Sequence, residues 1–167
     1  MNAYKYSIQL NEERLPMLVK EKAYYRVDRR FCFDGPQKIW ELSQDIGLDK
    51  MAEEYMYCIC MDTRMRVIGL FEVSHGTVRY ALASPREIFQ KALMLGAVYI
   101  TLIHNHPSGD PTPSPEDTAL TRSVFNAGEV LGITLIDHVV VGYNCYCSFR
   151  SDGLEPFAKE EKEKKNV

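Results

Sequence analysis

Short apolar runs and amphipathic stretches follow one another along most of this chain, so the pattern of hydrophobic and polar positions predicts both strands and helices. Runs of mostly apolar residues are typical of buried strands, whereas apolar residues at helical spacing after a proline are typical of helices. Strands are predicted at residues 54–62, 67–73, 100–103, 133–136, 138–141 and 145–149. Helices are predicted at residues 36–46, 84–95 and 115–127, and are expected to end at Gly47, Gly96 and Gly128.

The mixture of strands and helices predicts an α/β fold in which helices flank a curled, mixed β-sheet. Ahead of this unit, residues 3–10 and 23–33 alternate enough to predict a pair of strands. The final residues carry a mixed-charge run that is predicted to be disordered. The predicted division is a strand pair packed on the core at residues 1–33, a main domain at residues 34–153 and a charged tail at residues 154–167.

Composition limits the class of protein and of partner. A chain of 167 residues, 46% of them hydrophobic, is long enough for a single domain with a substantial core. Its net charge of −3 and its lack of a long basic run give no support for a nucleic-acid partner, because binding to phosphates needs clustered lysine and arginine. Without a signal-peptide core or a run of about eighteen apolar residues, the chain is predicted to be cytoplasmic with no membrane partner.

A polar His104-Asn105-His106 triplet follows directly on the apolar run at residues 100–103. Residues two apart on an extended strand point to the same side, so both imidazoles can reach one ion. The next segment, residues 107–113, carries three prolines and one glycine, and this stiff turn should return Asp117 beside the strand end. Two imidazole nitrogens and one carboxylate oxygen suit zinc, and three protein ligands leave a fourth position for water, as in catalytic zinc sites.

Two simpler interpretations stand beside the metal site. A His-x-His pair at a strand end is common on surfaces or within hydrogen-bonded pairs that hold no metal. Ser114, Pro115 and Asp117 also make a good helix start, with serine at the N-cap, proline at the first helical position and an acid that reaches back to the cap. Capping alone does not explain two histidines ahead of a stiff loop that returns an acid, so the combined pattern favours a metal site.

A hydrolytic metal site also needs a base that accepts a proton from water, and Glu54 is the candidate for this role. It begins the predicted strand at residues 54–62, on the same face as Met56. From the local sequence alone, a solvated acid at the start of a strand is the simpler interpretation. His138 is predicted to pair with the carboxylate of Asp137 inside the core rather than to bind a metal.

From about Gly35 to Gly153 the chain resembles the RadC-like JAB domain, a bacterial branch of the JAMM or MPN+ metalloprotease superfamily. The metal motif of that family is a glutamate followed by His-x-His-x7-Ser-x2-Asp, and Glu54, His104, His106, Ser114 and Asp117 fit it with no departure. Segments typical of RadC proteins are also present at residues 84–89, 104–109 and 135–142. The resemblance implies the JAB/MPN architecture, which is related to that of cytidine deaminases.

The same resemblance implies a chemistry. One zinc ion would be held by His104, His106 and Asp117, with water in the fourth position, and Glu54 would accept the proton of that water. Ser114 would help to hold the oxyanion formed during hydrolysis of a peptide or isopeptide bond. The substrate would be an extended peptide or the tail of a ubiquitin-like protein, paired as an added strand beside the metal.

Two alternatives of another class are kept open. RadC-like proteins carry a DNA-repair label, so the chain could be a factor associated with DNA repair or recombination, although its charge gives no support for contact with DNA. It could also be a metal-containing binding module without proteolytic activity. The helix-hairpin-helix segment found in longer RadC proteins is not recognised in residues 1–33, where the resemblance is weak. The oligomeric state is not predicted.

Overall fold

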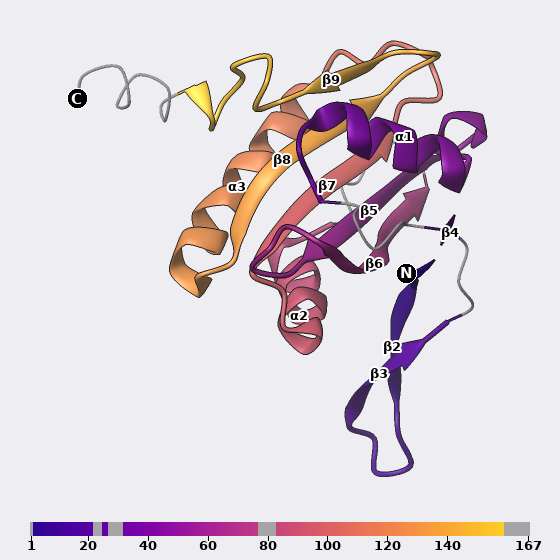
Figure 1. The fold of residues 1–167 in the computed structure, drawn as a ribbon, viewed down its shortest axis with the longest axis vertical. Helices are drawn as coiled ribbons and strands as arrows, with labels where there is room; N and C mark the ends of the chain where they lie inside the picture. Colours follow the sequence, from indigo (N-terminus) through magenta and orange to yellow (C-terminus); the bar gives the residue numbers. More distant parts are fainter. Residues whose placement is uncertain (1, 22–24, 27–31, 77–82, 159–167) are drawn as a thin grey trace.

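The computed structural model describes residues 2–21, 25–26, 32–76 and 83–158 of the chain. Its centre is a five-stranded mixed sheet, shown in Figure 1, in which β7 and β8 run parallel and the other neighbouring strands run antiparallel. The predicted α/β class with a mixed sheet is confirmed. In the order of their pairing, the strands are β6 (Val67–Gly76), β5 (Glu54–Met61), β7 (Tyr99–Asn105), β8 (Thr134–Val141) and β9 (Tyr146–Ser148).

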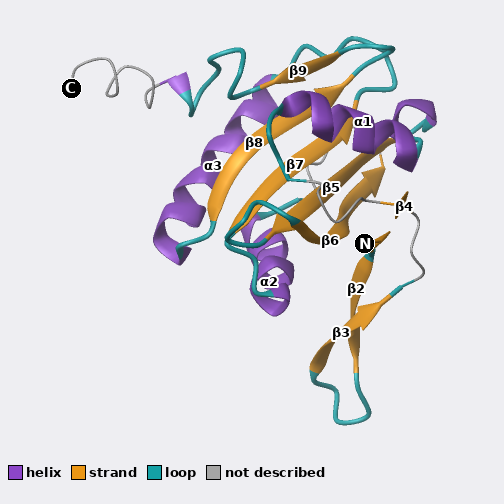
Figure 2. Ribbon diagram, in the orientation of Figure 1, coloured by secondary structure: helices purple, strands orange, loops and turns teal. Residues whose placement is uncertain are grey.

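Helices cover both faces of this sheet, as Figure 2 shows. Helix α1 (Pro36–Ile46) packs on one face, where its Ile39 and Leu42 form a core with alternate residues of β5, β7 and β8. Helices α2 (Pro85–Leu95) and α3 (Pro115–Leu131) pack on the opposite face, where Met56 and Cys58 of β5 belong to a second core. Strand β5 is therefore buried on both sides, which is why its sequence is nearly continuous in apolar residues. No helix in the described part of the chain is long and apolar enough to cross a membrane.

Two of the three predicted helix ends are confirmed, and the third is wrong. Helices α1 and α2 end before Gly47 and Gly96, which adopt the left-handed conformation at the C-cap. Helix α3 continues past Gly128 and ends before Gly132. A β-carbon at Gly128 would lie 2.5 Å from the carbonyl oxygen of Ile133, so this glycine allows close packing inside the helix rather than ending it.

The N-terminal segment forms a hairpin that differs from the predicted strand pair. Strand β2 (Tyr6–Leu10) pairs with β3 (Pro16–Lys20) and not with residues 23–33. Within that predicted strand, β4 (Tyr25–Arg26) pairs with β1 (Asn2–Ala3), and residues 23–24 and 27–31 lie outside the described part. Of the first predicted strand, only Ala3 pairs with a residue of the second, Tyr25, because alternation indicates a strand but does not select its partner.

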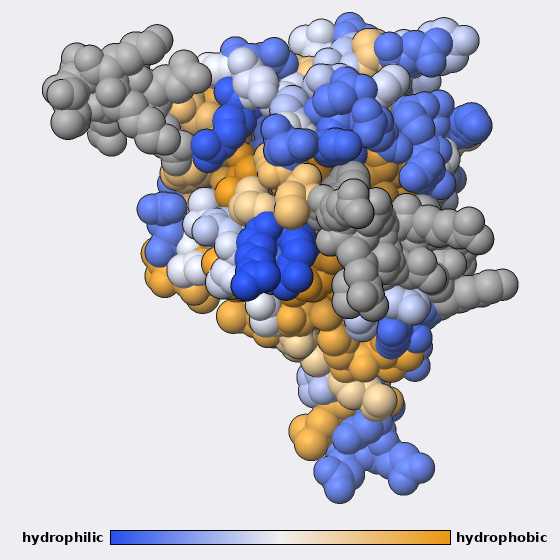
Figure 3. All heavy atoms as spheres, in the orientation of Figure 1, coloured by the Kyte–Doolittle hydropathy of each residue, from blue (hydrophilic) through white to orange (hydrophobic). Residues whose placement is uncertain are grey.

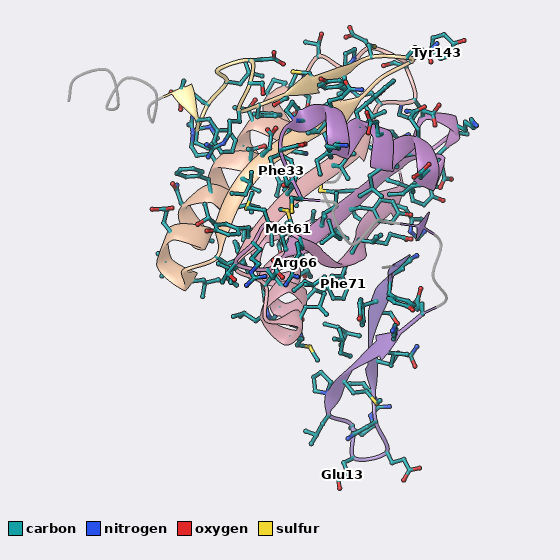
Figure 4. All side chains as sticks on the ribbon, in the orientation of Figure 1. Glu13, Phe33, Met61, Arg66, Phe71 and Tyr143 are labelled. Atoms are coloured by element: carbon teal, nitrogen blue, oxygen red, sulfur yellow. The ribbon has the colours of Figure 1, made fainter. Side chains whose placement is uncertain are left out.

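The hairpin projects from the sheet, with Glu13 at its tip in Figure 4. Near its base, the backbone N–H of Leu70 donates to the carbonyl of Tyr4 at 3.1 Å, and Lys5 forms an ion pair with Glu72 at 2.7 Å. Figure 3 shows hydrophobic surface along this projection. Leu10, Leu15 and Met17 of the hairpin are exposed hydrophobic residues.

The other end of the chain packs in part on the core. Within the predicted tail, Leu154 and Phe157 contact the core beneath α3, and Phe157 is 2% exposed. Residues 159–167 lie outside the described part. Both cysteines of β5, Cys58 and Cys60, are buried free thiols, whereas Cys145 and Cys147 are half-buried and free.

Candidate metal centre

Three of the predicted site residues meet where β7 ends and α3 begins. His104 is buried near the end of β7, His106 follows that strand, and Asp117 lies in the first turn of α3. The Nε2 atoms of the two histidines are 3.0 Å apart. Oδ1 of Asp117 is 3.2 Å from Nε2 of His104, and Oδ2 is 3.4 Å from Nε2 of His106. The three side chains therefore present their ligand atoms to one common point.

These separations fit a metal ion. Zinc binds nitrogen and oxygen at about 2.0–2.1 Å, and two such ligands at the tetrahedral angle lie about 3.3 Å apart. The chemistry of the donors also fits. His104, His106 and Asp117 supply two imidazole nitrogens and a carboxylate, a set that is typical of catalytic rather than structural zinc sites because one coordination position stays open.

Each imidazole is held in the form that can bind a metal through Nε2. Nδ1 of His106 lies 2.8 Å from the carbonyl oxygen of Asp110, which can only accept, so Nδ1 carries the proton and Nε2 keeps its lone pair. Two lone pairs and a carboxylate converge here, an arrangement that favours a cation among them. Protonation of Nε2 would let His106 donate to Asp117, and this hydrogen bond raises the pKa of His106 more than burial lowers it.

His104 is oriented by a chain of hydrogen bonds that we call the Thr121–His138 relay. The hydroxyl of Thr121 donates to the main-chain carbonyl of Asp117 at 2.5 Å, and its oxygen accepts from Nδ1 of His138 at 2.7 Å. Nε2 of His138 then has a free lone pair and accepts from Nδ1 of His104 at 2.8 Å. Nε2 of His104 is left unprotonated and faces the cluster. Metal-binding histidines commonly donate their other ring N–H to a second group, and for His104 this group is His138.

The prediction that His138 pairs with the carboxylate of Asp137 is wrong. That carboxylate accepts from the hydroxyl of Ser148 at 2.6 Å and from the main-chain N–H groups of His138 and Arg150 at 2.7 and 3.0 Å. The imidazole of His138 lies with His104 and Thr121 instead. Complete burial lowers the pKa of His138 well below its ordinary value, so the ring is neutral, as the relay requires.

Asp117 caps the helix and faces the cluster at the same time, so the two interpretations of this residue do not exclude each other. Oδ2 of Asp117 accepts from the main-chain N–H and the hydroxyl of Ser114 at 2.8 and 2.6 Å. Burial by itself raises the pKa of Asp117, but its interactions with the rings of His104 and His106 and the hydrogen bond from Ser114 outweigh burial and lower this pKa far below its ordinary value. The carboxylate is therefore ionised and ready to bind a cation.

Glu54 begins β5, directly beside the strand that carries the histidines. Met56 pairs with His104 across the antiparallel β5–β7 ladder, so Glu54, two residues earlier on the same face, lies toward His106. Its charge is close enough to contribute to the raised pKa of His106. Glu54 does not belong to the group of three converging ligands.

Asn105, between the two histidines, holds the segment that carries Glu54. Its side chain is 2% exposed and points to the opposite face of β7. The amide oxygen accepts from the N–H of Tyr55 at 2.8 Å, and the amide nitrogen donates to the carbonyls of Glu53 and Met51 at 3.0 and 3.3 Å. The residues before and after Glu54 are thus both fixed by one buried side chain, which we call the Asn105 clamp.

Residues 33–154 match the family described as the RadC-like JAB domain. The chain belongs to this family. It is 41% identical over 120 residues to a UPF0758 protein of Thermotoga maritima, covering 72% of this chain and 53% of the relative. A UPF0758 protein of Symbiobacterium thermophilum is 46% identical over 126 residues, covering 75% and 53%. This RadC-like chain therefore spans about half the length of the curated relatives it matches.

Asn105, Thr121 and His138 were not predicted to take part in the site of this RadC-like domain. The sequence does carry one signal for Thr121, because a polar residue four positions after Asp117 lies on the same helix face, which is otherwise buried. The partners of Asn105 and His138 come from other elements of the fold, and no local pattern in the sequence indicates them.

The Asn105 clamp leads to the first prediction for this RadC-like domain. Replacing Asn105 with alanine leaves the N–H of Tyr55 and two carbonyls without their partner, which should lower the free energy of unfolding by about 1–3 kcal/mol. The capacity of the three converging side chains to bind a metal ion should persist, because they are unchanged. Denaturant unfolding and metal content after loading, measured together, check this. A folded variant that no longer binds metal, when the parent protein does, would contradict the separate roles of the clamp and the converging side chains.

Proposed function

We propose that this RadC-like JAB domain is a zinc-dependent hydrolase that cleaves a peptide or isopeptide bond. The observation that carries the proposal is the convergence of the ligand atoms of His104, His106 and Asp117 at one point. The names of the relatives describe no activity. The proposal therefore depends on the chemistry of the donors and on the position of Glu54.

Zinc, when bound, supplies a Lewis acid that lowers the pKa of a coordinated water to about 7 and polarises a substrate carbonyl. His104, His106 and Asp117 would hold the ion. Glu54 would accept the proton of the attacking water and pass it to the leaving amine, which a carboxylate beside the ligands can do without binding the ion itself. The role of Ser114 at the oxyanion stays a prediction, because its hydroxyl donates to Asp117 in this structure.

The metal content of the purified protein tests this proposal first. We expect about one zinc per chain by mass spectrometry, lost in His104→Ala and in Asp117→Ala, because each variant removes one of three ligands. His75→Ala is the matched control, since His75 is an exposed histidine that pairs with Glu72 outside the cluster. Zinc that persists in both site variants, or is lost in the control, would contradict the assignment of the ligands.

Activity is the second part of the test. The zinc-loaded protein should cleave members of a mixed peptide library, and the chelated protein should not. Cleavage that survives complete removal of zinc would contradict a metal-dependent hydrolase.

Zinc binding should depend on pH in a direction that follows from His106. Asp117 raises the pKa of His106 when no metal is bound, so a proton competes with zinc up to a higher pH than it would at an ordinary histidine. Affinity for zinc should therefore fall as the pH drops through this pKa, by about tenfold per pH unit for each competing proton. Calorimetric titration in buffers of different ionisation enthalpy would show proton release on binding. An affinity equal at pH 5.5 and pH 7.5 would contradict this prediction.

A further inference from the structure

Strand β3 forms the free edge of the N-terminal hairpin. Among the described strands, β2 is its only partner. The opposite side of the chain that leads into β2 faces the central sheet, because the N–H of Leu70 in β6 donates to the carbonyl of Tyr4 and Lys5 forms a parallel bridge with Leu70. Strand β3 therefore lies on the side of the hairpin that points away from β6, and Figure 1 shows the hairpin extending beyond the body of the domain.

The hydrogen bonds at the two ends of the hairpin show which backbone groups of β3 point outward. The N–H of Glu21 donates to the carbonyl of Lys5, and the N–H of Asn11 donates to the carbonyl of Leu15, both at 2.9 Å. In an antiparallel pair, hydrogen-bonded pairs of residues alternate with pairs that are not bonded. With the continuous register between these ends, the odd-numbered residues of β3 bond to β2 and the even-numbered residues point outward.

The outward groups are the N–H and carbonyl of Leu18 and Lys20 and the carbonyl of Pro16, which has no N–H. An edge strand of this kind is a template for another strand, and natural edges are commonly protected by charged residues or bulges. The centre of β3 has neither, since Met17, Leu18 and Val19 are apolar and their pairing shows no register shift. A two-stranded hairpin is also only marginally stable by itself, so a further strand would stabilise it.

The sequence of β3 complements itself when a second copy runs antiparallel to it. With Leu18 on a two-fold axis, each Leu18 bonds to Leu18 of the other copy through both its N–H and its carbonyl. Met17 then faces Val19 of the other copy, and the N–H of Lys20 donates to the carbonyl of Pro16 of the other copy. Apolar side chains face apolar ones and no like charges are opposed. A register shifted by two residues would instead place Leu18 opposite Lys20 or Pro16.

We propose that β3 pairs antiparallel with β3 of a second copy about a two-fold axis at Leu18, which joins the two hairpins into one sheet and makes the protein a homodimer. Pairing would cover Met17, which is 43% exposed in the single chain. Both free edges are used once the strands pair, so the assembly closes at two copies. The interface is small, and the dimer should therefore form only at high concentration. The proposal does not depend on the proposed hydrolase, whose metal ligands lie at β7 and α3.

Sedimentation velocity of the full chain over a range of concentrations tests the dimer. We expect monomer at low concentration and dimer at high concentration. Met17→Lys should raise the dissociation constant at least about tenfold, because it places a charge against Val19 and brings two like charges together on neighbouring strands. Gln9→Lys is the matched control, since Gln9 is exposed on the same face of the hairpin but lies on β2, opposite Met17 and one strand further from the axis. It should leave the dissociation constant unchanged.

A second pair of variants tests the backbone. Lys20→Pro removes an outward N–H and leaves the hydrogen bonds to β2 intact, so it should also weaken the dimer. Leu10→Pro removes an outward N–H from the other edge of the hairpin and should not. Thermal unfolding of each variant shows whether the domain remains folded.

A disulfide tests the register. Residues of a hydrogen-bonded antiparallel pair have Cα atoms about 5.5 Å apart, which a disulfide can span. Leu18→Cys should therefore form a linked dimer under mild oxidation, because this residue faces its own copy on the axis. Val19→Cys contains the same native cysteines but faces Met17 of the other copy, and it should not become linked.

Three results would overturn the proposal. The first is a parent protein that stays monomeric up to about 1 mM. The second is a dimer that either Met17→Lys or Lys20→Pro leaves unchanged. The third is equal cross-linking of Leu18→Cys and Val19→Cys.

Discussion

Replacing Glu54 with glutamine is expected to lower the rate of peptide hydrolysis about 10²–10⁴-fold, because glutamine cannot accept a proton. Glutamine has nearly the same size as glutamate, and Glu54 is not one of the three converging ligands, so zinc content and thermal stability should stay unchanged. Most of the loss should fall on kcat, since the base acts in the reaction and contributes little to binding of the substrate. Steady-state kinetics and metal analysis on the same preparation measure both.

Glu53 provides the control for this substitution. It is an exposed carboxylate one residue earlier, just before β5 begins, and it does not belong to the three converging ligands. Glu53→Gln should therefore keep full activity. Equal losses in the two variants would show that the net charge of the segment matters rather than a base, and a loss of zinc in Glu54→Gln would place Glu54 among the ligands.

Removing the hydroxyl of Thr121 is expected to weaken zinc binding about 10–100-fold, although Thr121 is not a ligand. Valine has nearly the shape of threonine, but Thr121→Val leaves Nδ1 of His138 without an acceptor. The proton of His138 can then move to Nε2, where it meets Nδ1 of His104, and His104 must shift its own proton to Nε2, the atom that faces the cluster. Competition with a chelator measures the affinity for zinc.

Thr121→Ser separates this effect from a loss of packing, because serine keeps the hydroxyl and removes only a methyl group. The nitrogen chemical shifts of His104 report which ring nitrogen carries the proton, even in the metal-free protein. We expect Nδ1–H in the parent and in Thr121→Ser, and a mixture of both forms in Thr121→Val. If the affinity for zinc and the protonation of His104 are unchanged in Thr121→Val, the relay does not orient His104.

Much of the fold follows from local pattern. The starts of α2 and α3 follow from a serine cap and a proline, which satisfy and preset the first turn without help from the rest of the molecule. The end of α3 cannot be predicted from local pattern, because a glycine can either end a helix or permit close packing. Only the position of Ile133 against Gly128 shows which of the two applies.

In the candidate site, too, some features follow from local sequence and others only from tertiary contacts. The sequence by itself determined that His104 and His106 share one face, that a stiff loop returns Asp117, and that Ser114 caps the helix, since all of these depend on spacing along a strand, a loop and a first turn. The tertiary structure decided which partner each group has. Sheet pairing brings Glu54 beside the histidines, and helix packing brings Thr121 to His138. Such contacts join residues distant in sequence, and their choice depends on how all the elements pack together rather than on any local pattern.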